Sequence, residues 1–173
     1  MFLLKHCTLW VLIFFCASSH AQFLPDNSSL NLQSVQRWMN SNRDLAGVVQ
    51  ALDAMHKTDD DVKKFDALPA VEQDQKIAVF LQENTLQESA TAVAARHGWK
   101  SVGEYMRFST RLGNAIAAYF FEQETMNLSD AQRQSIRAKT DPTVLQTPAA
   151  DIAFVKNHEA LLKNYIQAYA AGR

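Results

Sequence analysis

The chain has 173 residues and an almost balanced charge, with 17 lysines and arginines against 18 aspartates and glutamates. Nucleic acids and anionic membrane surfaces attract proteins that carry an excess of basic side chains. The composition therefore gives no electrostatic case for binding either of them.

Residues 1–21 have the pattern of a secretory signal peptide. Lys5 gives a basic start, residues 8–17 form an apolar run, and residues 19–21 (Ser-His-Ala) place small side chains where cleavage would occur. The apolar run is too short for a helix that spans a bilayer. We therefore expect cleavage between Ala21 and Gln22, and delivery to the periplasm of a Gram-negative bacterium or to the outside of the cell.

Cleavage at this position would change the chemistry of the chain. It would remove both cysteines, Cys7 and Cys16, and so leave no thiol for a disulfide, a metal or a nucleophile. Loss of Lys5 would move the formal net charge from −1 to −2. We expect residues 22–30 to form a flexible polar arm and residues 31–173 to form a single helical domain without a membrane span.

From Asn31 onward, apolar residues recur three or four positions apart, which is the period of one face of a helix. Asn31 is expected to cap a first helix, and Asn42 or Asp44 to start a second one. Asp59 begins a short helix that ends at Pro69, and Pro69 suits the first turn of the next helix. No stretch of useful length alternates as a strand would.

Residues 85–126 carry the clearest helix signals. Thr85 and Glu88 have the spacing of a capping box at the start of a helix. Gly98 is expected to end that helix in the left-handed conformation.

A long helix is predicted to follow over about residues 102–126. Ser101 and Glu104 have the spacing of a second capping box at its start. The small residues of the segment 113–118 would let another helix approach closely, and we expect this to be packing within the chain.

The last third of the chain repeats the same signals. Ser129 starts a short helix, and Asp141 and Thr147 each stand before a proline, as capping residues do. The final helix is expected over about residues 148–171. The patterns together predict an all-α, single-domain bundle with two long helices, about 102–126 and 148–171, and several shorter ones.

Two segments resemble known proteins. Residues 96–105 (RHGWKSVGEY) resemble a helix–glycine–aromatic–serine–helix junction of small exported bacterial helical proteins of unknown function. Residues 128–132 (LSDAQ) are similar to the Leu-Thr-x-x-Gln motifs of the Spy/CpxP periplasmic chaperones, with serine in place of threonine. The first resemblance implies an exported helical fold, and the second implies a chaperone.

Histidine is the first residue type to consider for a functional site. After cleavage three would remain, and their spacing does not place any two on one helix face. His56 and His97 lie near predicted helix C-termini, where a cation is favoured. His158 falls on the apolar face of the last helix. It either makes a hydrogen bond in the core or lines a ligand site together with Tyr165.

Arg107 and Arg111 lie four residues apart on one helix face and are candidate contacts for an anionic ligand or a partner. Glu104 could instead pair with Arg107. Residues 59–61 are three aspartates but lack the glycine and glutamate of a calcium loop. No catalytic residue, cofactor or metal ligand is predicted, because no nucleophile elbow, phosphate loop or paired metal ligands occur.

These observations favour an exported, non-enzymatic helical domain that acts through contact with an unidentified protein. The alternatives are a periplasmic carrier of a small apolar ligand, with a pocket near His158, and a Spy/CpxP-like chaperone. An enzyme that uses scattered glutamate, histidine or tyrosine residues is the remaining interpretation. The oligomeric state is not predicted.

Overall fold

The computed structural model describes residues 30–56 and 58–171. These residues are helical with short connections and contain no strand, which confirms the all-α prediction. The predicted signal peptide, residues 1–21, lies outside the described residues, as do residues 22–29 of the predicted arm.

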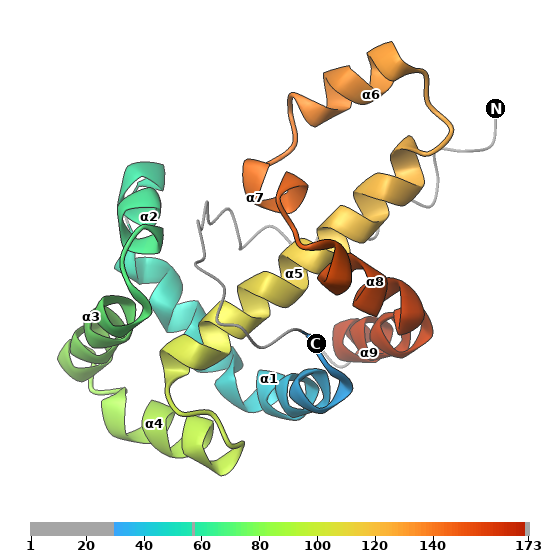
Figure 1. Cartoon of the computed structure of the whole chain (residues 1–173). Helices are drawn as coiled ribbons and strands as arrows, with labels where there is room; N and C mark the ends of the chain where they lie inside the picture. The colour runs from blue at the N-terminus through green and yellow to red at the C-terminus, as the bar shows by residue number, and fades with distance from the viewer. Residues whose placement is uncertain (1–29, 57, 172–173) are drawn as a thin grey trace.

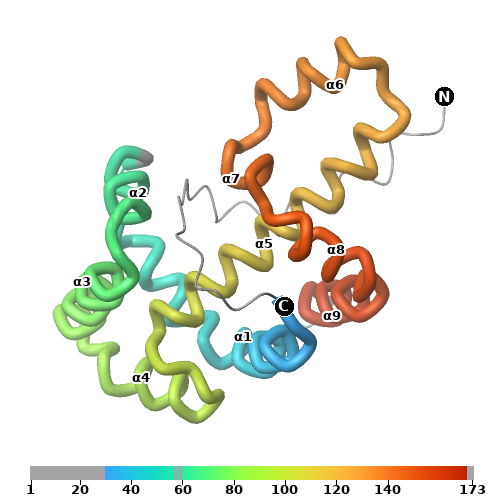
Figure 2. Tube along the Cα trace, in the orientation of Figure 1, coloured from blue at the N-terminus to red at the C-terminus, as the bar shows by residue number. Residues whose placement is uncertain are grey.

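The longest helix, α5, has 24 residues and extends from the group formed by α1 to α4 to the group formed by α8 and α9 (Figures 1 and 2). Its bounds match the prediction to within one residue. In chain order the elements are α1 (Leu32–Leu52), the 3-10 turn η2 (Asp53–Met55), α2 (Asp59–Asp66), α3 (Ala70–Glu83), α4 (Gln87–Arg96), α5 (Val102–Thr125), α6 (Asp130–Arg137), α7 (Pro142–Leu145), α8 (Ala149–Asn157) and α9 (Glu159–Ala171).

Helix α1 is one continuous helix of 21 residues, so the prediction of a second start at Asn42 or Asp44 is wrong. Asn31 does cap it, because its side chain accepts a hydrogen bond from the backbone N–H of Ser34. Asn42 and Asp44 have the side chains of capping residues, but here they bond to other helices. Asn42 binds Tyr105 at 2.8 Å, and Asp44 lies on the outer face of α1.

The first hydrophobic cluster joins α1, α3, α4 and the start of α5 around Leu45, Leu81 and Trp99. Gly98 has a φ of 78°, which confirms the predicted left-handed end of α4. The chain then folds back, and the Trp99 N–H donates to the Ala94 carbonyl at 3.0 Å. This turn places the Trp99 ring against α1, where its Nε1–H donates to the Ser41 hydroxyl at 3.0 Å.

Two of the predicted capping boxes differ from the structure. Thr85 itself has a φ of 58°, and α4 begins two residues later without a side-chain cap, so the box with Glu88 does not form. Ser101 caps α5 by accepting from the Glu104 N–H at 2.9 Å. The Glu104 carboxylate accepts from the Lys100 N–H instead of returning to Ser101.

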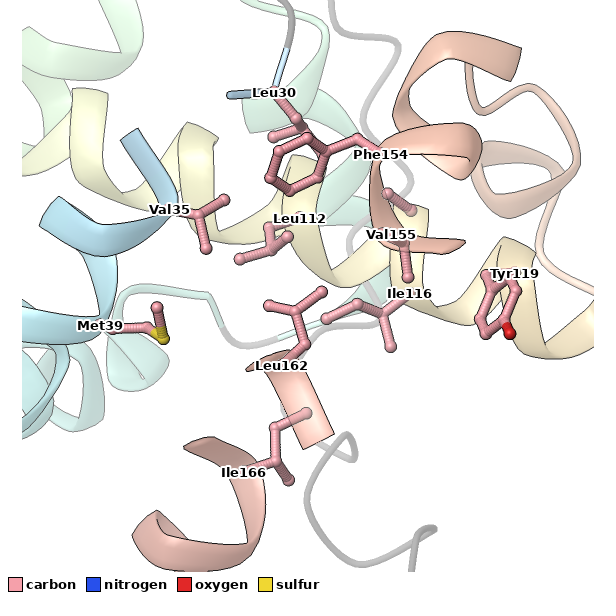
Figure 3. Close-up of a cluster of buried hydrophobic side chains, with 11 residues drawn as sticks. Leu30, Val35, Met39, Leu112, Ile116, Tyr119, Phe154, Val155, Leu162 and Ile166 are labelled. Carbon is pink, nitrogen blue, oxygen red and sulfur yellow. The ribbon is translucent and has the colours of Figure 1, made fainter. Parts of the chain in front are cut away.

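The second hydrophobic cluster joins the later part of α5 to α8, α9 and the start of α1 (Figure 3). Ala115 of α5 is buried in the cluster that contains Phe154 and Val155 of α8, and Ala118 is buried as well, which agrees with the close packing within the chain predicted for the segment 113–118. Leu30 is only 5% exposed, so this last residue of the predicted flexible arm belongs to the core. Trp38 and Phe108 contact both clusters.

The predicted last helix is interrupted at His158, which separates α8 from α9. His158 has φ −120° and ψ 20°, while its N–H still donates to the Phe154 carbonyl at 3.1 Å. At the start of α8, Pro148 occupies the cap position. The Thr147 hydroxyl donates back to the Thr143 carbonyl and does not cap the helix as predicted.

Candidate functional site

Residues 126–140, here called the α6 arm, leave the end of α5 and reach α7. All eight residues of α6 are exposed, and the helix stands apart from the body of the molecule (Figure 1). Ser129 and Gln132 form the predicted capping box at its start. Two large apolar side chains of the arm face solvent, with Met126 59% exposed and Ile136 40% exposed.

The α6 arm is also basic. It contains Arg133, Arg137 and Lys139 but only one acidic residue, Asp130. Arg133 donates to the Leu128 carbonyl at 3.3 Å, which ties the helix to the turn before it. The arm therefore combines apolar and cationic groups on a short exposed helix.

The two arginines proposed as ligand or partner contacts form ion pairs inside the fold. Arg107 Nη1 lies 2.6 Å from Asp74 Oδ1 and joins α5 to α3. Arg111 Nε lies 2.6 Å from Asp151 Oδ2, and its Nη2 lies 3.1 Å from Oδ1, which joins α5 to α8. Asp151 is fully buried and also accepts from the Leu30 N–H at 3.4 Å. Both arginines thus hold helices together.

Tyr165 lies in a hydrogen-bond network between α1, α5 and α9. Its hydroxyl accepts from Asn42 Nδ2 at 3.1 Å and donates to the Met39 carbonyl at 3.3 Å. The Tyr105 hydroxyl donates to Asn42 Oδ1 at 2.8 Å. Burial raises the pKa of Tyr105 to about 12 and also raises the pKa of Tyr165, so both phenols stay protonated and keep these bonds at neutral pH.

The three described histidines contact different residues. His158 stacks on Phe154 with 4.3 Å between ring centroids, and its Nδ1 lies 2.9 Å from the Phe154 carbonyl oxygen. His97 Nε2 lies 2.8 Å from Asp44 Oδ2, and this hydrogen bond lowers the pKa of Asp44. The described residues contain no group of three side chains placed to hold a metal ion.

A groove lies between the first two turns of α1 and the end of α4. Its volume is about 750 Å³, and it is lined mainly by polar and cationic side chains, among them Gln36, Arg37, Asn40, Arg96 and His97.

A second hollow lies between α5, α8 and α9 and is lined by apolar groups including Ile116, Tyr119 and Leu162. Its volume is only about 10 Å³. Ligand pockets hold roughly 300 Å³ or more. This hollow therefore gives no support to a carrier of apolar ligands.

No family model, curated protein or solved structure matches this chain. These comparisons do not test the two resemblances. A relation of residues 96–105 to exported helical proteins, or of residues 128–132 to Spy/CpxP chaperones, therefore stays a prediction. Within the described residues, no helix is both long and apolar enough to cross a membrane.

Sequence reasoning missed the groove. Arg37 and Arg96 are about 60 residues apart in the chain and lie on different helices, and no sequence motif contains both of them. One local signal exists, since Gln33, Gln36 and Asn40 share a polar face of α1 at helical spacing. That pattern does not reveal which helix lies beside it.

Proposed function

We propose that this chain is an exported helical domain that binds another protein through the α6 arm and has no catalytic role itself. The observation that supports this most directly is the complete exposure of α6. A helix of eight residues is only marginally stable in water without packing. A surface that covers its apolar side chains would stabilise it.

The position of the exposed apolar groups supports the same proposal. Met126 begins the α6 arm and is 59% exposed, and Ile136 lies in the last turn of α6 and is 40% exposed. Apolar groups with cationic neighbours are common where proteins bind one another, with the apolar group providing contact area and arginine providing directed hydrogen bonds. Arg137 follows Ile136 directly and is exposed.

The proposal can be tested with a photoreactive phenylalanine derivative at position 136 of the whole chain, expressed in its own host. Illumination should link the chain to one protein and give a discrete larger band. The matched control is position 79 on α3, because Val79 is also an apolar residue, 54% exposed, on a different surface. A band from both positions, or from neither, would contradict a binding site on the arm.

A chaperone is the second candidate, because the chaperone-like residues 128–132 form the turn and the first residues of α6. A chaperone of this kind should suppress the aggregation of several unrelated unfolded proteins. A domain with one specific partner should not. Light scattering of heated model proteins, with the wild type compared to Ile136→Ser, separates the two.

A further inference from the structure

The groove between α1 and α4 carries a second inference, which is independent of the α6 arm. Its cationic side chains are Arg37 and Arg96, and none of the residues that line it is a carboxylate. Asp44 contacts His97 from beside the groove, and Glu104 lies 3.9 Å from Arg37. The lining itself therefore has a positive charge that an anionic ligand could use.

Arg37 is held in place before any ligand arrives. Its Nη1 donates to the Gly98 carbonyl at 2.9 Å, and its guanidinium carbon lies 3.8 Å from the centroid of the Trp99 ring. A guanidinium has five N–H donors. One is bonded to Gly98 and Nη2 lies 3.9 Å from Glu104, so Nε and further N–H groups are left for a ligand carboxylate. Fixing the side chain beforehand reduces the entropy cost of binding.

Arg96 provides a second cation across the groove. It is exposed at the last turn of α4, and its charge also acts on Asp44, whose pKa it helps to lower. Hydrogen bonds from arginine to a carboxylate are charge-assisted and about twice as strong as neutral ones. Arg96 can therefore add affinity at the α4 side of the groove.

Carboxamide side chains line the α1 side of the groove. Gln33, Gln36 and Asn40 lie along one face of the helix, and Gln36 Nε2 donates to Asn40 Oδ1 at 3.2 Å. Each amide has both donors and acceptors, which suits the alternating N–H and C=O groups of an extended peptide. Leu32, 50% exposed, adds an apolar contact at one end.

We propose that this groove binds an extended acidic peptide segment of another protein. Its carboxylates would pair with Arg37 and Arg96, and its backbone would bond to the amides of α1. A lone small anion would use the arginines but leave the row of amides without partners.

The test uses the purified protein and two capped peptides, acetyl-(Glu-Gly)4-amide and acetyl-(Gln-Gly)4-amide, which differ only in charge. The glutamate peptide should shift backbone amide NMR signals at Gln33, Gln36 and Asn40. The glutamine peptide should bind about tenfold more weakly or worse, since it lacks charge-assisted hydrogen bonds.

Two variants locate the binding site. Arg96→Gln should weaken the glutamate peptide about tenfold, the cost of one hydrogen bond to a charged group, with an unchanged melting temperature because Arg96 is exposed. Lys156→Gln on α8 is the matched control, because Lys156 is an exposed cation outside the groove, and this variant should bind as the wild type does. Equal binding of both peptides, no binding, or signal shifts confined to the α6 arm would overturn the proposal. So would glutarate binding as tightly as the peptide, because that would indicate a site for a small dicarboxylate.

Discussion

At the scale of single residues, Gly103 shows how closely α3 and α5 are fitted together. The Asp74 carboxylate occupies the space that a Cβ at this position would need. There it accepts from Arg107 Nη1 at 2.6 Å and from the Ser101 hydroxyl at 2.9 Å. Glycine is thus required here for close approach of a neighbouring side chain, although its φ is ordinary.

Gly103→Ala should therefore destabilise the protein even though alanine is the better helix former. The new methyl would displace Asp74 from both partners, and we expect a loss of about 1–3 kcal/mol, as for other overpacked sites. Gly47→Ala is the matched control, because nothing lies within 4 Å of its Cβ position in α1. That change should stabilise by about 0.5–1 kcal/mol. Urea unfolding measures the free energy of unfolding of both variants. Equal changes would contradict the position of the Asp74 carboxylate beside Gly103.

Asp44 gives a prediction on pH. The hydrogen bond from His97 lowers the pKa of Asp44 below its ordinary 3.8, so the ionised form is favoured in the folded state. The stability that it contributes should be present above pH 3.8 and should disappear as the pH falls through the lowered value. Unfolding of the wild type and Asp44→Asn between pH 3 and 7 should show the two curves converging in acid.

Asp53 is a control whose pKa is shifted in the opposite direction, so its effect on stability should change with pH in the opposite sense. Burial raises the pKa of Asp53, so its contribution is greatest in acid and is lost as the pH rises. Asp53→Asn should therefore gain stability relative to the wild type as the pH increases. If the stability of Asp44→Asn and of Asp53→Asn, each relative to the wild type, changed with pH in the same direction, the opposite pKa shifts of the two carboxyls would be contradicted.

At the scale of elements, the contact between Arg111 and Asp151 joins three parts of the chain. Asp151 of α8 is fully buried and accepts from Arg111 of α5 and from the Leu30 N–H at the start of α1. A buried carboxylate without its cation is costly. Removing the arginine should loosen all three contacts together.

Arg111→Met should lower the free energy of unfolding by about 3 kcal/mol, because it leaves the Asp151 carboxylate buried without a cation. Arg107→Met, one turn earlier on the same helix, should cost less, about 1 kcal/mol, because both side chains of this pair keep part of their surface in water. The side chain of its partner Asp74 is 32% exposed, against 1% for Asp151. Thermal or denaturant unfolding measures the loss of stability in each variant. Equal losses would contradict the prediction that the buried ion pair contributes more.

Helix ends could be predicted from sequence wherever the deciding contact is local. Gly98, Ser129 and Asp141 form the predicted helix ends, and the hydrogen bonds that make these ends join residues close together in the chain. The predictions at Asn42 and Thr85 were wrong. Asn42 bonds to Tyr105 and Tyr165, which a local pattern cannot reveal.

The candidate site was less predictable than the fold, for the same reason. The spacing of Arg107 and Arg111 correctly placed both on one stretch of α5, but their carboxylate partners lie 33 and 40 residues away. Exposure of the α6 arm could not be predicted, because a short amphipathic pattern looks the same whether its apolar face is covered or open. Contacts between distant elements decide both features.

At the scale of the whole molecule, export is the property that a single measurement can establish. We expect N-terminal sequencing of the protein from an exported fraction to begin at Gln22, because residues 19–21 provide the small side chains that signal peptidase requires. An intact Met1 in a membrane fraction would contradict this and would indicate a retained anchor.

Trp38 and Phe108 have a consequence for how the molecule comes apart. Each packs against both hydrophobic clusters, and α1 and α5 contribute residues to both. Neither cluster can open without exposing these two rings. Calorimetry should therefore show one cooperative transition with equal calorimetric and van't Hoff enthalpies. A fragment that ends within α5 should be unable to fold alone.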